Sequence, residues 1–177
     1  MRFRVLHYKT LDSTNRAARE FAEGGAEQGT TVVAEYQTHG RGRFNRKWHS
    51  PRGKGLLFSI VLRPNWSMAA APIVTHIAAQ SVRDVLQDVC GLNAKLKRPN
   101  DVLVGSKKIA GILTESTGAK RKISYVVVGI GLNVNTGSKD LVSGATSIYR
   151  ESGKKYTLQP ILEKILVMFR KRYLALA

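Results

Sequence analysis

Cysteine, acidic side chains and long apolar runs are all scarce in this sequence of 177 residues. A single cysteine, Cys90, excludes an internal disulfide and a zinc site built from several cysteines. No apolar run approaches the roughly 20 residues that a membrane-spanning helix needs. The first ten residues, MRFRVLHYKT, also lack the apolar core of a signal peptide. These absences predict a cytoplasmic protein without a membrane partner.

The shortage of acids leaves the chain strongly basic. Its 12 Asp and Glu stand against 29 Lys and Arg, which gives a formal net charge of +17 at pH 7. Such an excess favours a polyanionic partner or an anionic substrate, although it does not indicate a fold. Apolar residues make up 43% of the chain, which at this length is enough for one core and short for two. We therefore expect residues 1–177 to form a single domain.

Short strands and a few helices follow one another along the chain. Alternating or β-branched runs predict strands at 2–8, 30–36, 56–62, 94–97, 102–104, 109–116 and 123–133. Apolar residues at helical spacing predict helices from about 13 to 24, 70 to 89 and 157 onward, with Ile73 and Val89 on the apolar face of the second. GAKRK at 118–122 predicts a hairpin turn, and 136–156 a loop. The pattern indicates an α+β domain with a mixed, mostly antiparallel sheet and helices packed against it.

The most basic stretch is THGRGRFNRKWHSPRGKG, residues 38–55, with six Lys or Arg, four glycines and no acid. Glycine lets main-chain N–H groups come close to a ligand, and arginine can hold two oxygens of a phosphate or carboxylate at once. A solvated basic loop would carry the same charges. However, Phe44 and Trp48 interrupt the charge with large apolar groups, and predicted strands flank the loop. These features favour a loop that folds over an anionic ligand.

Two further stretches suggest places where a ligand approaches a strand. In LKRPNDVLVGSKKIAGILTES, residues 96–116, Lys108 stands at a strand start near Gly111, where it could reach an anion. An ordinary exposed turn is the alternative interpretation of the two adjacent lysines. In VVVGIGLNVN, residues 126–135, glycines inside a strand are typical of a close approach by a ligand or another backbone. No helix follows this GIG, so it is not a dinucleotide-binding fingerprint.

Five stretches occur together in one order: DSTN (12–15), AEYQTHGRGRFNRKWHSPRGKGLLFSIVLRP (34–64), KRPND (97–101), KKIAGILTE (107–115) and GIGLNVN (129–135). Together they resemble the catalytic domain of biotin protein ligases, in the biotin/lipoate ligase superfamily. The resemblance implies a class II aminoacyl-tRNA synthetase-like fold. It also implies an ATP-dependent, AMP-forming ligase that makes biotinyl-5′-AMP and transfers biotin to a lysine of a biotin carboxyl carrier domain.

The resemblance also implies roles for individual residues. Those expected to contact biotin are Ser13, Thr14, Gln37, Gly40, Arg41, Lys108 and Gly111. Those expected to contact ATP or the adenylate are Arg43, Trp48, Asn100, Asp101 and Asn133. Within these sets, Lys108, Arg41 and Arg43 are expected to act in catalysis. No motif forms a direct metal site, and Mg²⁺ is expected to arrive with ATP, near Asp101.

The sequence departs from the family pattern at Arg98, where a Trp is usual before PND. We expect neither an N-terminal DNA-binding domain nor a C-terminal β-barrel, and a homodimer is left open. A lipoate or octanoate ligase or transferase of the same superfamily is one alternative function. A non-catalytic relative that binds biotin or nucleic acid is another. GRGR and KRPND favour the biotin branch, and no helix-turn-helix, zinc finger or RNA-binding aromatic signature supports a nucleic-acid partner.

Overall fold

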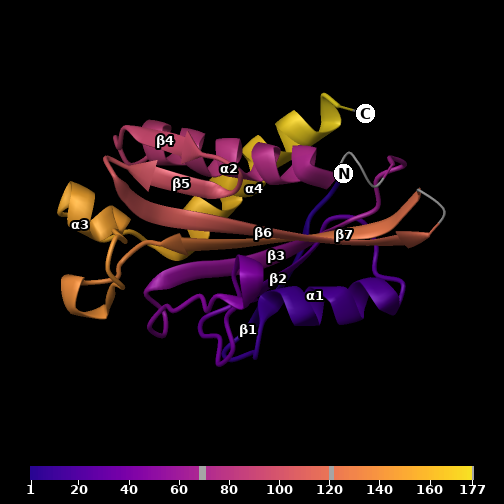
Figure 1. Cartoon of the computed structure of the whole chain (residues 1–177), viewed down its shortest axis with the longest axis horizontal. Coiled ribbons are helices and arrows are strands. Elements are labelled where there is room, and N and C mark those ends of the chain that lie inside the picture. The colour runs from indigo at the N-terminus through magenta and orange to yellow at the C-terminus, as the bar shows by residue number, and fades with distance from the viewer. Residues whose placement is uncertain (68–70, 120–121, 177) are drawn as a thin grey trace.

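The computed structural model describes residues 1–67, 71–119 and 122–176. The strands of the described residues form one sheet in the order β1-β2-β3-β7-β6-β5-β4 (Figure 1). Only β1 and β2 run parallel, and all other neighbours in this sheet are antiparallel. The strands are β1 (Arg4–Tyr8), β2 (Thr30–Ala34), β3 (Gly55–Leu62), β4 (Ala94–Lys97), β5 (Asp101–Val104), β6 (Lys107–Ala119) and β7 (Lys122–Asn133). The helices are α1 (Thr14–Glu23), α2 (Ala71–Asp88), α3 (Ile148–Ser152) and α4 (Leu158–Leu174).

The predicted α+β fold with a mixed, mostly antiparallel sheet is confirmed, and every predicted strand is present. Some strand bounds differ from the prediction. β1 begins at Arg4 rather than at residue 2, and β2 ends at Ala34 rather than at residue 36. The predicted start of the second helix at residue 70, and residues 120 and 121 of the predicted hairpin turn, lie outside the described residues.

The prediction that residues 136–156 form a loop was wrong in part, because this segment contains the short helix α3. Ser147 caps α3, since its side chain accepts a hydrogen bond from the backbone N–H of Arg150 at 3.1 Å. Gly153 ends the helix in the left-handed region, with φ 72°. A helix of five residues is too short to show a periodic apolar pattern.

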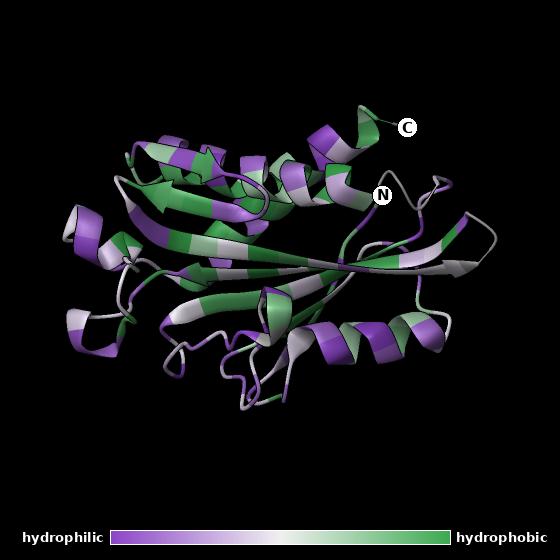
Figure 2. Ribbon diagram, viewed as in Figure 1, coloured by the Kyte–Doolittle hydropathy of each residue, from purple (hydrophilic) through white to green (hydrophobic). Residues whose placement is uncertain are grey.

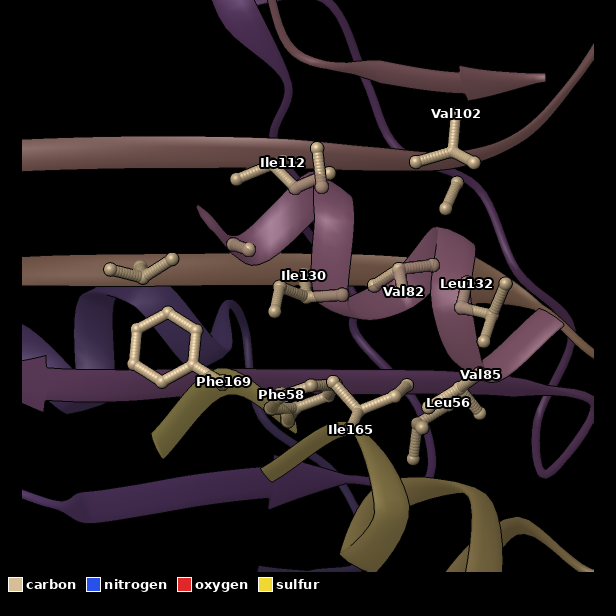
Figure 3. Packing of buried hydrophobic residues seen from close by; sticks show 14 of the residues in the cluster. Leu56, Phe58, Val82, Val85, Val102, Ile112, Ile130, Leu132, Ile165 and Phe169 are labelled. Carbon is tan, nitrogen blue, oxygen red and sulfur yellow. The ribbon is translucent and has the colours of Figure 1, made fainter. Parts of the chain in front are cut away.

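Helices cover the sheet unequally on its two faces. On one face α2 packs against β4 to β7 and against α4, and on the other α1 packs against β2, β3 and β7 (Figure 1). The larger apolar core lies beneath α2 and α4, where Phe58, Ile112 and Phe169 are fully or almost fully buried (Figure 3). Strand β3 is buried along its whole length because helices lie over both of its faces, and it is coloured mainly as apolar in Figure 2.

Two apolar residues of the second helical segment do not join this core. Ile73 is 45% exposed and Val89 is 42% exposed, so their predicted place on the buried face was wrong. Ile73 lies in the first turn of α2 and Val89 follows its last residue, so each lies at an end of the packed region.

Candidate active site

A pair of glycines forms the floor of the candidate site. Gly111 of β6 pairs with Gly131 of β7, and Gly131 pairs with Leu57 of β3 on the other side. A Cβ on Gly131 would lie 2.5 Å from Cε2 of Trp48, and one on Gly111 would lie 3.1 Å from Cζ3 of the same ring. Trp48 therefore lies directly over the two strands, in space that any larger residue at 131 would fill.

The indole of Trp48 carries a polar group without a protein partner. Its Nε1 atom is buried and makes no hydrogen bond to any of the described residues. A buried N–H group that lacks an acceptor is costly. An acceptor on a bound ligand would satisfy it.

Lys108 lies beside this floor. Its Nζ is 2.6 Å from Oδ1 of Asp101 and 5.6 Å from the ring centroid of Trp48. The register shifts between Val102 and Leu103, so that Lys108 pairs with Leu103. Lys107 is exposed whereas Lys108 is half-buried. Of the two adjacent lysines, Lys108 is thus the one that the fold brings to the glycine floor.

The N-terminus of α1 supplies a second, polar wall. Oε1 of Gln37 accepts hydrogen bonds from the backbone N–H of Thr14 at 2.7 Å and from its hydroxyl at 3.0 Å. Ser59 Oγ lies 2.8 Å from Thr14 Oγ1. Ser13, which caps α1, is buried beside them. Because these bonds occupy the oxygen of Gln37, its amide NH₂ group is the part left to bond a ligand.

Gly40 joins this wall to the floor. A Cβ on Gly40 would lie 2.3 Å from the backbone oxygen of Trp48 and 3.0 Å from Nε2 of Gln37. The backbone N–H of Trp48 donates to the carbonyl oxygen of Gly40 at 2.9 Å. The close approach requires glycine, and it places Trp48 between the polar wall and Lys108.

The residues that connect the wall to the basic loop were not predicted from the sequence. Asn15 Nδ2 donates to Glu115 Oε2 at 2.7 Å, and Arg41 Nη2 donates to Glu115 Oε1 at 2.9 Å. Ser59 Oγ also donates to Asn15 Oδ1 at 2.7 Å. Asn15 and Glu115 both lie within the motifs DSTN and KKIAGILTE, which were the available signal, although no role was assigned to either residue.

Two predicted site residues hold backbone segments in place. Asn100 Nδ2 donates to the carbonyl oxygen of Ile112 at 2.9 Å, and Arg43 Nη1 approaches Asn100 Oδ1 at 3.4 Å. Asn133 is buried and its Nδ2 donates to the carbonyl oxygen of Thr146 at 2.9 Å. These amides therefore fix the segments that border the site.

A pocket of about 380 Å³ opens over the glycine floor. Predicted residues that line it are Arg43, Trp48, Asn100, Asp101, Lys108, Gly111 and Asn133. The other predicted residues, Ser13, Thr14, Gln37, Gly40 and Arg41, do not line this pocket. They connect to it through Gly40, which lies against Trp48 and Gln37, and through Glu115, which bonds Arg41 and Asn15.

The site suits anionic ligands better than a bare metal ion. Within residues 1–67, 71–119 and 122–176, no group of three or more His, Cys, Asp or Glu could hold a metal. Asp101, which pairs with Lys108, is a carboxylate in the pocket. One carboxylate together with phosphate oxygens is a usual setting for Mg²⁺, so Asp101 fits an ion that arrives with a nucleotide. No helix in the described part of the chain is long and apolar enough to cross a membrane.

A basic loop over a glycine floor, with a lysine and a polar wall beside it, defines a site for an anionic ligand that also has a polar, hydrogen-bonding end. A family model described as the biotin/lipoate A/B protein ligase family matches residues 7–133. The chain belongs to this family, as the sequence resemblance predicts.

The most informative relatives agree with this assignment. The bifunctional ligase/repressor BirA of Bacillus subtilis is 38% identical over 173 residues, which cover 96% of this chain and 53% of the relative. A biotin–[acetyl-CoA-carboxylase] ligase of Paracoccus denitrificans is 37% identical over 168 residues, covering 90% of this chain and 69% of the relative. The chain thus spans about half the length of the Bacillus protein.

Solved structures show the same fold. The biotin protein ligase of Aquifex aeolicus, in complex with biotin and ATP, superposes with a TM-score of 0.79 and is 32% identical, covering 94% of this chain and 68% of that chain. The predicted biotin protein ligase-like catalytic fold is thereby confirmed.

Proposed function

We propose that this protein is a biotin protein ligase, which activates biotin with ATP and transfers it to a lysine of a biotin carboxyl carrier domain in the cytoplasm. The observation that carries the proposal is the position of Lys108, which Asp101 and Trp48 hold at the edge of the glycine floor. The family match and the biotin and ATP complex of the Aquifex relative support it.

The first step joins two anions, and the site contains the cations that this requires. A carboxylate oxygen of biotin attacks the α-phosphorus of ATP, a new P–O bond forms, and pyrophosphate leaves. Lys108 and Arg43 line the pocket and would offset the negative charge that builds up on the phosphate. Mg²⁺ would neutralise the phosphates of ATP, with Asp101 as the protein carboxylate near it.

In the second step, the amine of the target lysine attacks the carbonyl carbon of biotinyl-AMP. An amide bond forms, the bond from carbonyl carbon to phosphate oxygen breaks, and AMP leaves with the electron pair. No covalent enzyme intermediate is needed. The protein's part is to hold the anhydride and exclude water, a role for Arg41, Arg43 and Trp48.

The polar wall of α1 is the reason to favour biotin over lipoate or octanoate. Ser13, Thr14 and Gln37 bring hydroxyl and amide groups together, a polar set that suits a ureido ring, with Gly40 and Arg41 beside them. Gly111 makes room for Trp48 and Lys108, and Asn100 and Asn133 line the pocket in which the nucleotide end would lie. A site built to hydrogen-bond one substrate discriminates strongly against an analogue that lacks the bonding group.

The test is to incubate the protein with MgATP and either biotin or octanoate, and to quantify the acyl-adenylate by mass spectrometry. We expect biotinyl-AMP to form in preference to octanoyl-AMP by about 100-fold or more. Gln37→Leu should narrow that preference. Equal amounts of the two adenylates would instead support the lipoate or octanoate alternative.

A further inference from the structure

The mouth of the 380 Å³ pocket carries unusually exposed apolar side chains. Phe44 is 82% exposed and Val142 is 61% exposed, which makes them the two most exposed large apolar side chains of the described residues. Both line this pocket, although they come from segments about 100 residues apart. Exposed apolar groups that gather beside a pocket are typical of an interaction surface.

The backbone at Phe44 holds its ring outward. Phe44 has φ 55°, the one positive φ at a residue other than glycine in the described part of the chain. A bulky residue in this region is strained, and such strain persists only where the surroundings fix it. The guanidinium carbon of Arg43 lies 4.9 Å from the centroid of the ring, on which it stacks. The ring therefore lies in solvent with Arg43 stacked on it.

Four exposed cations accompany these apolar groups at the mouth. They are Arg46, Lys47, Lys97 and Arg98, and each lines the pocket. No ion pair joins any of them to a carboxylate of the described residues. The inner cations differ, since Lys108 pairs with Asp101 and Arg41 with Glu115.

The strand register extends this charge along the open face of the sheet. Lys97 pairs with Asp101, and Asp101 pairs with Gly111, so the three lie on the face that carries the glycine floor. Lys95 lies two residues from Lys97 on the same face and is also exposed. Lysines on an edge strand such as β4 also discourage sheet-to-sheet pairing, but that role does not require them to line a pocket.

We infer that this rim, formed by Phe44, Arg46, Lys47, Lys97, Arg98 and Val142, docks the protein domain that accepts the acyl group. The matching surface of that domain carries acidic side chains around an apolar centre. The inference rests on the proposed function. These residues line the pocket in which the adenylate would lie, so an acceptor lysine that enters this pocket passes them. An apolar centre with a polar rim is the usual anatomy of a protein interface, and complementary charges speed its formation.

The same features argue against nucleic acid as the partner. The cations come from two separate segments beside one pocket, rather than from one stripe that could follow a backbone. Val142 is aliphatic, and the ring of Phe44 is already stacked by Arg43, so the rim lacks the row of free rings on which successive bases stack. Asp140, also at the mouth, would repel phosphates.

The experiment separates acceptor docking from adenylate chemistry. One variant replaces Phe44 and Val142 by Ser, and a second replaces the four rim cations by Gln. The matched control replaces four exposed cations of the 154–170 region by Gln: Lys154, Lys155, Lys164 and Arg170. Each variant is first checked for an unchanged thermal unfolding midpoint. Biotinyl-AMP formation is measured without an acceptor, and transfer is measured to a biotin carboxyl carrier domain and to hydroxylamine.

Both rim variants should raise KM for the carrier domain about tenfold, while adenylate formation and transfer to hydroxylamine stay within about twofold. The cation variant should also lose most of the salt dependence of transfer. The inference is wrong if adenylate formation falls as much as transfer to the carrier domain, because the rim would then bind ATP. It is also wrong if the control variant loses as much transfer as the rim variant.

Binding measurements keep the inference testable apart from catalysis. If the wild-type chain makes no biotinyl-AMP, the proposed function fails. Binding of the same carrier domain to the wild type and to the rim variants, measured by biolayer interferometry, then decides on docking alone. Equal binding by all of them would overturn docking. Rim-dependent binding of a 20-base-pair DNA duplex at about 150 mM salt, without rim-dependent binding of the carrier, would favour nucleic acid instead.

Discussion

Lys107 and Lys108 are adjacent and chemically identical, yet the fold gives them different surroundings. Lys108 contacts Asp101 and Trp48 and is half-buried, whereas Lys107 is exposed and pairs with Val104. Lys108→Ala should therefore reduce adenylate formation by about 100-fold, in the range seen when a group that stabilises transition-state charge is removed. Adenylate formation is measured by pyrophosphate release for both variants, and Lys107→Ala should change its rate by no more than about twofold. The opposite result would mean that the register is wrong.

Glu115 connects the basic loop to α1, because it accepts hydrogen bonds from both Arg41 and Asn15. We expect it to act as a positioning residue for Arg41. Glu115→Gln should raise KM for biotin by about tenfold with little change in kcat, since a bond to a charged group is worth about 1.5 to 3 kcal/mol. The same change made in an Arg41→Ala background should add nothing. Additive losses in the double variant would indicate a purely structural role.

At the scale of single residues, the sequence singled out the charged residues and the glycines of the candidate site because they lie within motifs. It did not predict how Ser59, Asn15 and Glu115 join. Asn15 and Glu115 are 100 residues apart, and Ser59 and Asn15 are 44 apart. Only the pairing of strands brings them together, and no local pattern encodes that pairing.

Among the elements, long periodic segments were predictable and short or irregular ones were not. α2 and α4 follow apolar residues at helical spacing, and β3 is a nearly continuous apolar run. Neither the five-residue helix α3 nor the register shift beside Leu103 has such a signal. That shift matters for function, because it determines which residue of β5 faces Lys108.

The basic loop is the element whose behaviour should change most on ligand binding. The side chain of Arg41 is hydrogen-bonded to Glu115 and that of Arg43 to Asn100, and both residues stand next to Gly42. We expect the amides of Gly40–Arg46 to exchange hydrogen quickly in the unliganded protein. A non-hydrolysable biotinyl-AMP analogue should slow their exchange about tenfold or more, because its phosphate supplies an anion for the arginines. β6 and β7 serve as internal controls, and unchanged exchange at saturation would contradict a ligand-ordered loop.

The whole chain has 29 Lys and Arg but only 12 Asp and Glu, so a buried carboxylate is a scarce partner for its cations. Asp84 of α2 is such a group, because it is 9% exposed and accepts hydrogen bonds from Arg83 at 2.9 Å and from Arg172 of α4. Burial raises the pKa of Asp84, but the hydrogen bonds from Arg172 and Arg83 outweigh burial and hold the pKa below its usual 3.8. The carboxylate thus joins the two helices that cover the larger core.

A lowered pKa in the folded state fixes the pH at which Asp84 stabilises the protein. Its contribution is fully present above the unfolded pKa near 3.8 and is lost as pH falls through the lower folded pKa. Asp84→Asn should therefore reduce the free energy of unfolding at pH 7 by about 1.5 to 3 kcal/mol. The loss should be the same at pH 5.5 and should shrink below pH 3.8, as followed by urea unfolding. Repulsion among the many cations will weaken every variant in acid, so Asp88→Asn, an exposed change on the same helix, provides the reference. If Asp84→Asn and Asp88→Asn lose stability in parallel at every pH, the carboxylate does not join the two helices in the way that its contacts indicate.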